Sequence, residues 1–417
     1  MADRRRGLIL SRALLGMLPK SVRYHVMREK LEVSPELDPR FTFKIAQTQD
    51  ELTEAYRILH DCYLEMGYTQ EHPSGMRIVK YFALPTTTTL IAYYDDRIVG
   101  TISIIRKTAL GLPMEAAFDL EEAVGNNQVI AEVSSLAIDS RFRQKRGALF
   151  LPLCKFFWEY VSQYMNLDGV VITVNPSMAD FYEGFLNFKE LPRAKISHYS
   201  FANGHPGVGL YLNVKTAPEE FKKIYNHKKI EKNLYYYFTQ LKLKNFILPE
   251  RKFYKSSDPV MSPDMLEYFF IHKADVFRQM SEGERLEVFS MYPFENYKTV
   301  FSDERLRKDI RYHVNIRAQS GVELEKWDLT ILDVGKNGVK VSSPNRLSGI
   351  VRLKIKIADE CTAEIRGEVR WENSKKNIYG LKLLRVDSNW ERFIRYLDSD
   401  FGVILEAMEL RNTGSGR

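Results

Sequence analysis

Two arginines, Arg307 and Arg311, stand four positions apart directly before the alternating run YHVNIRA. The guanidinium group is planar, always charged and able to form paired hydrogen bonds with a phosphate or with the edge of a guanine. It also stacks on flat rings. Two such groups at the entrance of a strand could hold a nucleotide, although an R-x-x-x-R spacing alone is typical of solvated surface charge.

A loop about twenty residues further on has the chemistry to complete such a site. The stretch DVGKNG contains Asp333, Gly335 and Gly338 and separates two predicted strands. Glycine lets backbone amides approach a ligand closely, and an aspartate can accept hydrogen bonds from the amide edge of guanine. Together, the arginine pair, the loop and the strand pattern favour binding of a negatively charged purine nucleotide.

This combination resembles the PilZ domain, a bacterial receptor module for cyclic di-GMP, whose pattern is R-x-x-x-R followed by [D/N]-x-S-x-x-G. The resemblance covers roughly the last quarter of the chain, and Gly335 replaces the serine. The missing hydroxyl removes one hydrogen bond of about 1 kcal/mol, or one order of magnitude in affinity. A barrel that has lost binding is the alternative. The resemblance implies these cyclic di-GMP contacts: Arg307, Lys308, Arg311, Asp333, Gly335 and Gly338.

A second constellation lies in VIAEVSSLAIDSRFRQKRGALF, where a strand with Glu132 runs into a basic turn and then a helix. A helix N-terminus with free amides and flanking cations binds anions. Gln144 and Gly147 resemble part of the GNAT acyltransferase phosphate loop, Q/R-x-x-G-x-G/A, but Leu149 stands at its last small position. This departure favours phosphopantetheine on an acidic carrier protein over tightly bound coenzyme A.

Four blocks spread over residues 41 to about 215 resemble the FeeM-type N-acyl amino acid synthases, GNAT-fold relatives of the autoinducer synthases. The blocks are GTISIIRKTALGLPMEAAF, AEVSSLAI, VNPSMADFYEGFLNF and YSFANGHPGVGLYLNV. The family joins a long-chain acyl thioester, usually on acyl carrier protein, to an amine. Relatives often have an arginine where this chain has Ser135. The resemblance implies acyl carrier protein or acyl-coenzyme A as the donor.

Direct attack of an amine on a thioester needs few protein groups. Glu132 is the candidate base, and backbone amides of residues 132–136 can hold the oxyanion. Tyr182 lies where GNAT enzymes have the tyrosine that protonates the leaving thiolate. The alternatives are a structural ion pair for Glu132 and a packing role for Tyr182. Arg106 could bind a carboxylate or be a surface charge at a strand end. The predicted acyl-donor contacts are Ser134, Leu136, Arg143, Gln144, Lys145, Arg146 and Gly147.

Composition limits the other possibilities. The 417 residues are 44% hydrophobic and 28% charged, which predicts a globular protein of two or three domains. The net charge of +7 is not concentrated in a Lys/Arg tract, so no nucleic-acid polymer is expected as a partner. The three cysteines lack metal spacing, which predicts reduced thiols, no metal site and a cytoplasmic location. Residues 1–40 predict a basic amphipathic segment that docks on the protein or contacts a membrane peripherally.

The elements that must position these residues follow from periodicity. Residues 41–215 alternate strands and helices and predict an α/β GNAT-like domain. Residues 216–300 predict a helical connector rich in Lys and aromatics. Residues 301–417 predict a C-terminal six-stranded antiparallel β-barrel of PilZ type with a final helix.

The sequence thus predicts a cyclic di-GMP-responsive enzyme that moves a fatty acyl group from a carrier-protein or coenzyme A thioester to an amino acid or another amine. The alternative is a cyclic di-GMP effector without catalysis, in which a degenerate acyltransferase scaffold regulates a partner. Ser135 and Leu149 favour the effector, whereas the intact E-x-S strand favours the enzyme.

Overall fold

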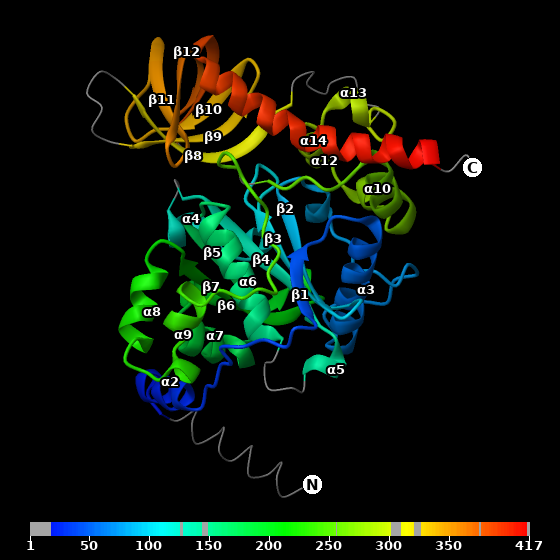
Figure 1. Ribbon diagram of the computed structural model, residues 1–417, viewed down its shortest axis with the longest axis vertical. Helices are drawn as coiled ribbons and strands as arrows, with labels where there is room; N and C mark the ends of the chain where they lie inside the picture. Colours follow the sequence, from blue (N-terminus) through cyan, green and yellow to red (C-terminus); the bar gives the residue numbers. More distant parts are fainter. Residues whose placement is uncertain are drawn as a thin grey trace, which may run out of the picture.

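The computed structural model describes residues 18–125, 128–143, 149–255, 257–301, 310–320, 327–374 and 377–414, with side chains up to residue 406. A β-barrel lies against one end of a larger α/β domain, and the last helix runs from the barrel across that domain (Figure 1). Among the helices of the described residues, none is long and apolar enough to cross a bilayer.

A seven-stranded sheet forms the centre of the α/β domain, in the order β1-β2-β3-β4-β5-β7-β6. All neighbouring strands are antiparallel except β4 and β5. The hairpin between β2 and β3 turns at Asp95, whose φ is +51°. The strands are β1 (Phe41–Ile45), β2 (Thr87–Tyr94), β3 (Arg97–Arg106), β4 (Ile130–Ile138), β5 (Gly169–Val174), β6 (Lys189–Tyr199) and β7 (His205–Asn213).

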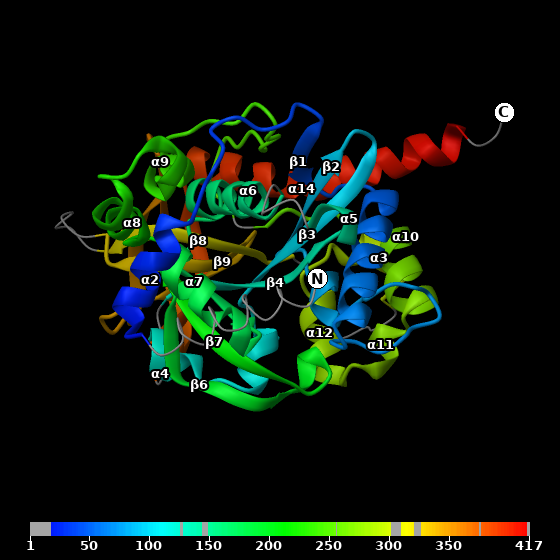
Figure 2. The same cartoon turned by 90° about the horizontal axis from the view of Figure 1, so that it is seen from below.

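Helices cover both faces of this sheet, with α3 and α6 on opposite sides (Figure 2). A capping box lies at the start of α3, where Thr48 accepts a hydrogen bond from the amide of Glu51 and Glu51 accepts one from the amide of Thr48. It starts the longest helix of the domain. The helices are α2 (Lys20–Glu29), α3 (Gln49–Glu65), α4 (Leu120–Val124), α5 (Ser140–Arg143), α6 (Phe150–Gln163) and α7 (Ala179–Leu186).

Strands β4 and β5 part soon after they meet. Their parallel pairing joins Ile130–Glu132 to Gly169–Val171 and goes no further, although both strands continue. A register shift in the pairing of β3 with β4 marks a bulge at Ser135 and Leu136. The divergence opens the sheet at its centre, next to Glu132.

The connector is helical only in parts. It begins with α8 (Ala217–Tyr225) and α9 (Leu234–Thr239) and then runs extended along the sheet edge, where Phe246 bridges Phe43 of β1. Its second half contains α10 (Pro263–Glu267), the π-helical turn η6 (Tyr268–Lys273), α11 (Val276–Gln279), α12 (Glu282–Phe289) and α13 (Phe294–Tyr297).

The C-terminal part is a closed barrel in the order β10-β13-β12-β11-β8-β9, with every pair antiparallel, so the predicted six-stranded barrel is confirmed. Closure leaves no open sheet edge. Helix α14, the predicted final helix, follows the last strand. The elements are β8 (Tyr312–Ser320), β9 (Leu329–Gly335), β10 (Gly338–Ser342), β11 (Ile350–Ala358), β12 (Cys361–Asn373), β13 (Ile378–Val386) and α14 (Ser388–Gly414).

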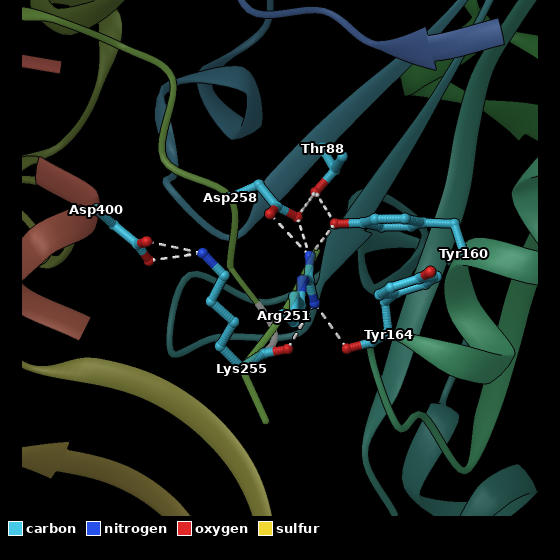
Figure 3. Close-up of polar contacts among 7 residues, drawn as sticks. All are labelled: Thr88, Tyr160, Tyr164, Arg251, Lys255, Asp258 and Asp400. Carbon is cyan, nitrogen blue, oxygen red and sulfur yellow. Dashed lines mark hydrogen bonds and ion pairs between the residues drawn. The ribbon is translucent and has the colours of Figure 1, made fainter. Parts of the chain in front are cut away.

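A buried arginine joins the connector to the α/β domain (Figure 3). Arg251 donates to both carboxylate oxygens of Asp258 at 2.7 Å and to the hydroxyl of Tyr160 at 2.9 Å. It also donates to the backbone carbonyls of Tyr164 and Lys255, at 2.7 and 2.8 Å. A buried guanidinium with this many acceptors is stable only while all of them stay in place.

The neighbouring Lys255 extends this network to α14, since its Nζ lies 2.8 and 2.9 Å from the two carboxylate oxygens of Asp400. Asp400→Asn should lower the free energy of unfolding by about 1–2 kcal/mol, because a largely buried ammonium group loses its counter-charge. Urea denaturation measures this. Glu54→Gln, in an exposed pair with Arg57, should change it by less than about 0.5 kcal/mol. Equal losses in both variants would contradict the interpretation.

Candidate active site and ligand loop

A cavity of about 170 Å³ lies where β4 and β5 diverge. Its wall is mostly apolar and receives side chains from the strands and from helices on both faces of the sheet. Tyr63 of α3 lies on one side, and Trp158 of α6 and Tyr182 of α7 also line the wall. Phe221 of α8 and Phe238 of α9 close it from the connector. An elongated apolar group is the chemistry that such a wall accepts.

Glu132 brings a carboxylate into this apolar wall. Its side chain is buried, with 2% of its surface exposed, and Oε2 accepts a hydrogen bond from the amide of Met114 at 2.8 Å. Burial raises the pKa of Glu132 to about 8. The ion pairs that the structure gives for the described residues do not include Glu132. A carboxyl group with this pKa can exchange a proton near neutral pH.

The bulge in β4 supplies backbone groups beside Glu132. Ser135 has a φ of +58°, a left-handed conformation that is strained for a residue with a side chain. Ser134, Ser135 and Leu136 all line the cavity. Ser134 and Leu136 are the two predicted acyl-donor contacts on this strand. A bulge leaves its extra residue outside the strand ladder, so its backbone groups can serve a ligand.

Tyr182 lines the same cavity, and its ring packs against Phe150, Phe181 and Phe188 with centroid distances of 6.4, 5.6 and 5.8 Å. Burial raises the pKa of Tyr182 well above its ordinary value, so the phenol stays protonated. The structure thus shows Tyr182 packed in the cavity wall, and its role as an acid stays a prediction.

Helix α2 supports the helix that carries Tyr182. Arg23 pairs with Asp180 at 2.7 Å, and Lys20 pairs with Glu183 at 2.9 Å. Residues 20–29 of the basic N-terminal segment thus dock on the protein itself. Of the leucines that give this segment its predicted apolar side, Leu8, Leu10, Leu14 and Leu15 lie outside the described residues, and Leu18 is 38% exposed.

The basic turn is described only in part. Arg143 donates to the carbonyl of Ile138 at 2.7 Å and pairs with Glu65 at 2.8 Å. Leu149, which departs from the GNAT loop pattern, is buried, and its Cδ2 would lie 3.2 Å from a Cβ on Gly100. Its side chain therefore fills core space above a glycine. The other predicted acyl-donor residues, Gln144, Lys145, Arg146 and Gly147, lie outside the described residues.

The predicted surface position of Arg106 is wrong. Its side chain is 4% exposed and Nη2 donates to the backbone carbonyl of Val314 in β8, at 2.8 Å. It is neither at the surface nor in the cavity wall, but between the sheet and the barrel. Nothing in the run ISIIRK signals this, because the acceptor is about two hundred residues away.

Sequence reasoning missed the aromatic residues around Glu132. Tyr199 of β6 and Tyr63 line the cavity with it, and burial together with the charge of Glu132 raises the pKa of Tyr199. Arg77 stacks on Tyr63 and on Phe201, with distances of 5.1 and 4.9 Å to the ring centroids, and donates to the Phe201 carbonyl. These residues come from separate segments, so no spacing could have found them.

The ligand loop of the barrel brings three of its predicted residues together. Arg311 donates to the carbonyl of Gly338, and its Cδ would lie 3.0 Å from a Cβ on Gly335. The arginine therefore lies over the loop between β9 and β10. Arg307 and Lys308 lie outside the described residues.

Asp333 has ionic partners in this structure. Its two carboxylate oxygens lie 2.7 Å from Nδ1 of His313 and 2.8 Å from Nζ of Lys340. Although burial acts in the opposite direction, these two neighbours hold the pKa of Asp333 far below its ordinary value. The carboxylate is therefore ionised and already oriented, and a guanine edge would have to compete with His313 and Lys340 for it.

The position of Arg311 gives a physical reason for Gly335. A Cβ there would lie 3.0 Å from both Arg311 Cδ and the Ile310 carbonyl oxygen. Gly335→Ser should therefore lower the free energy of unfolding by about 1–2 kcal/mol, as thermal denaturation can test. Gly283→Ser in α12, where a Cβ meets nothing within 4 Å, should keep or slightly raise stability. A Gly335→Ser variant as stable as the parent would show that the loop accommodates the side chain.

Two family models match the chain: N-acyl amino acid synthase FeeM over residues 54–213, and the PilZ domain over residues 305–399. A comparison with curated proteins gives no match. The sequence-based resemblance is confirmed for both halves.

Solved structures similar to this chain include FeeM, an N-acyl amino acid synthase from uncultured soil microbes. It is 27% identical, covering 44% of this chain and 95% of that chain, with a TM-score of 0.38. The AHL synthase LasI is 15% identical over 42% and 93%, with a TM-score of 0.32. The CoA-dependent acyl-homoserine lactone synthase BjaI is 14% identical over 51% and 95%, with a TM-score of 0.34. On its family matches, the chain joins an N-acyl amino acid synthase FeeM domain to a C-terminal PilZ domain.

Proposed function

We propose that this protein transfers a fatty acyl group from a thioester to the amine of an amino acid or another amine, and that cyclic di-GMP regulates the transfer. The donor is acyl carrier protein or coenzyme A. The observation that carries the proposal is a buried carboxyl group, Glu132, in the wall of an apolar cavity within the FeeM-matching region.

The chemistry proceeds without a covalent enzyme intermediate. Glu132 in its ionised form takes a proton from the substrate ammonium, directly or through water, and the free amine attacks the thioester carbonyl. The C–N bond forms, the C–S bond breaks, and backbone amides of the β4 bulge hold the oxyanion between these events. As the tetrahedral intermediate collapses, Tyr182 donates its proton to the leaving thiolate and recovers one, through water, from the nitrogen that has bonded to the acyl carbon. The apolar wall receives the acyl chain.

The donor's phosphopantetheine arm carries negative charge. Arg143 and residues 144–147 are the basic stretch that precedes α6 in the sequence, and we assign them to this arm, with Ser134 and Leu136 beside the thioester. Arg143 is already bonded to Ile138 and Glu65, so the assignment requires it to rearrange or to act through its charge alone.

In the barrel, we assign the phosphates and guanines of cyclic di-GMP to Arg307, Lys308 and Arg311, and one guanine edge to Asp333, with Gly335 and Gly338 shaping the loop. The match to the PilZ model and the position of Arg311 over this loop support the assignment. The three free cysteines support a cytoplasmic location.

A product assay tests the proposal. The full-length protein is incubated with dodecanoyl-acyl carrier protein or dodecanoyl-coenzyme A and mixed amino acids, with and without cyclic di-GMP, and N-acyl products are measured by mass spectrometry. The expected result is an N-acyl product whose yield depends on cyclic di-GMP. Nucleotide binding without any product would overturn the enzyme and favour the effector that uses a degenerate scaffold.

A further inference from the structure

Strand β8 belongs to the barrel but also bonds to the α/β domain, against which it lies (Figure 1). Arg106, the last residue of β3, donates to the carbonyl of Val314 at 2.8 Å. One residue on, Asn315 and Asn166 exchange two hydrogen bonds, in which each side-chain amide donates to the other residue's backbone carbonyl, at 2.6 and 3.1 Å. Two successive residues of β8 therefore anchor it to the α/β domain.

This anchor lies beside the strands that carry the candidate base. In the register of β3 with β4, Arg106 pairs with Ala131, and Ile105 pairs with Glu132. Asn166 precedes β5, the strand that pairs with β4 at Glu132 and then diverges. A shift of β8 would therefore act where β4 and β5 begin to diverge and form the cavity.

The start of the same strand contacts the ligand loop. His313, one residue before Val314, pairs with Asp333 at 2.7 Å, and Arg311 lies two residues further back over the loop. Burial lowers the pKa of Arg106 to about 10 while the charge of Asp333 acts in the opposite direction. The electrostatic interaction between Arg106 and Asp333 thus crosses the domain boundary.

We propose that β8 itself transmits the nucleotide signal, through the contact of Val314 with Arg106 and of Asn315 with Asn166. A guanine that engages Asp333 competes with His313 and so changes how the adjacent Val314 sits on Arg106. This inference rests on the proposed function, because it assumes that cyclic di-GMP binds the loop and that Glu132 serves the transfer.

The energetics of buried polar groups make this contact suitable for such a role. Because the Arg106 guanidinium is 4% exposed, water cannot take the place of the Val314 carbonyl as its hydrogen-bond acceptor. Arg106 must therefore move with Val314 or leave a buried donor without that acceptor. Either response changes the end of β3, which is bonded along its length to β4.

Helix α14 offers the competing route, since Asp400 joins it to Lys255 and through the connector to Arg251 (Figure 3). This route meets the domain at Tyr160 and Tyr164, at the end of α6, and at Thr88 of β2, not at β4, which carries Glu132. It therefore provides a matched control for the β8 contact.

Hydrogen exchange followed by mass spectrometry separates the two routes. The full-length protein and three variants, Arg106→Lys, Asn315→Ser and Asp400→Asn, are compared with and without saturating cyclic di-GMP, whose binding is measured separately by calorimetry. In the parent and in Asp400→Asn, the nucleotide should change exchange in β3 and β4 by about fivefold or more. In Arg106→Lys and Asn315→Ser, which should still bind the nucleotide, the change should fall below about twofold. Asn315→Ser carries the test if Arg106→Lys does not fold.

The possible failures are distinct. Three results would overturn only this inference. The first is nucleotide binding without a change in hydrogen exchange in β3 and β4 of the parent. The others are a parent-like change in folded Arg106→Lys or Asn315→Ser, and no change in Asp400→Asn. An intact response in a protein that forms no acyl product would overturn the catalytic part of the proposed function and leave the inference standing. A parent that binds no cyclic di-GMP would overturn the regulatory part and the inference together.

Discussion

Glu132→Gln should lower product formation by about two to four orders of magnitude, because the substrate ammonium loses the group that takes its proton. The loss should appear in kcat more than in the KM for the acyl donor. In the parent, kcat/KM should rise with pH up to about 8, where Glu132 becomes ionised, and this dependence should vanish in the variant. Steady-state kinetics across pH measure both effects.

The same variant should also be more stable at high pH. Burial raises the folded-state pKa of Glu132 from 4.5 to about 8, so between these pH values the native protein holds a proton that the unfolded chain has lost. The free energy of unfolding of the parent therefore falls as pH rises through this range. Glutamine does not titrate, so Glu132→Gln lacks this loss. Thermal denaturation should show the advantage of Glu132→Gln growing up to about pH 8.

A matched variant separates catalysis from general charge loss. Glu122→Gln removes a half-exposed carboxylate from α4, 3.6 Å from Arg193, and should leave kcat and its pH profile as they are. Turnover in Glu132→Gln within about twofold of the parent would contradict the role as base, since a purely structural carboxylate leaves kcat in place.

Arg311→Ala should weaken cyclic di-GMP binding by about a hundredfold or more. Loss of a charge-assisted hydrogen bond removes about 1.5–3 kcal/mol, and a bidentate contact with a phosphate or guanine is at the upper end of that range. The fold should survive, because Arg311 precedes β8 and the barrel is closed by backbone pairing between its six strands. Isothermal titration calorimetry measures the affinity.

Arg352→Ala is the control for this experiment. Arg352 lies on β11, with 73% of its side-chain surface exposed, and pairs with Glu364, so its loss removes the same charge from the barrel away from the loop. Its affinity for cyclic di-GMP should match that of the parent. Equal affinity in Arg311→Ala and the parent would refute the assignment of Arg311 to the ligand.

Local patterns predicted the elements well where a short-range interaction decides the structure. The capping box at Thr48 and Glu51 starts α3, and the stretch IAEVSSLAI forms β4 from its first residue to its last. The barrel strands followed from alternation at period two, because each has one face toward the barrel core. The domain boundaries at residues 40, 215 and 300 and the roles of the site residues stay predictions.

The connector illustrates where local patterns reach their limit. Helices α8 and α9 were separated from the α/β domain on composition alone, yet Phe221 and Phe238 close the cavity. The extended stretch near Phe246 was predicted as part of a helical segment, but it bridges β1. Its conformation is decided by a partner about two hundred residues earlier in the chain, which no local propensity contains.

The sequence by itself determined the element types, the two family resemblances and the residues able to do chemistry, Glu132 and Arg311 among them. These depend on side-chain type and on neighbours within a few positions. Only the tertiary structure decided that Glu132 is buried beside aromatic rings, that Arg311 lies over Gly335, and that Arg106 joins the two domains. Burial and long-range hydrogen bonds set these properties, because the free energy of a charge depends on which distant groups replace the water around it.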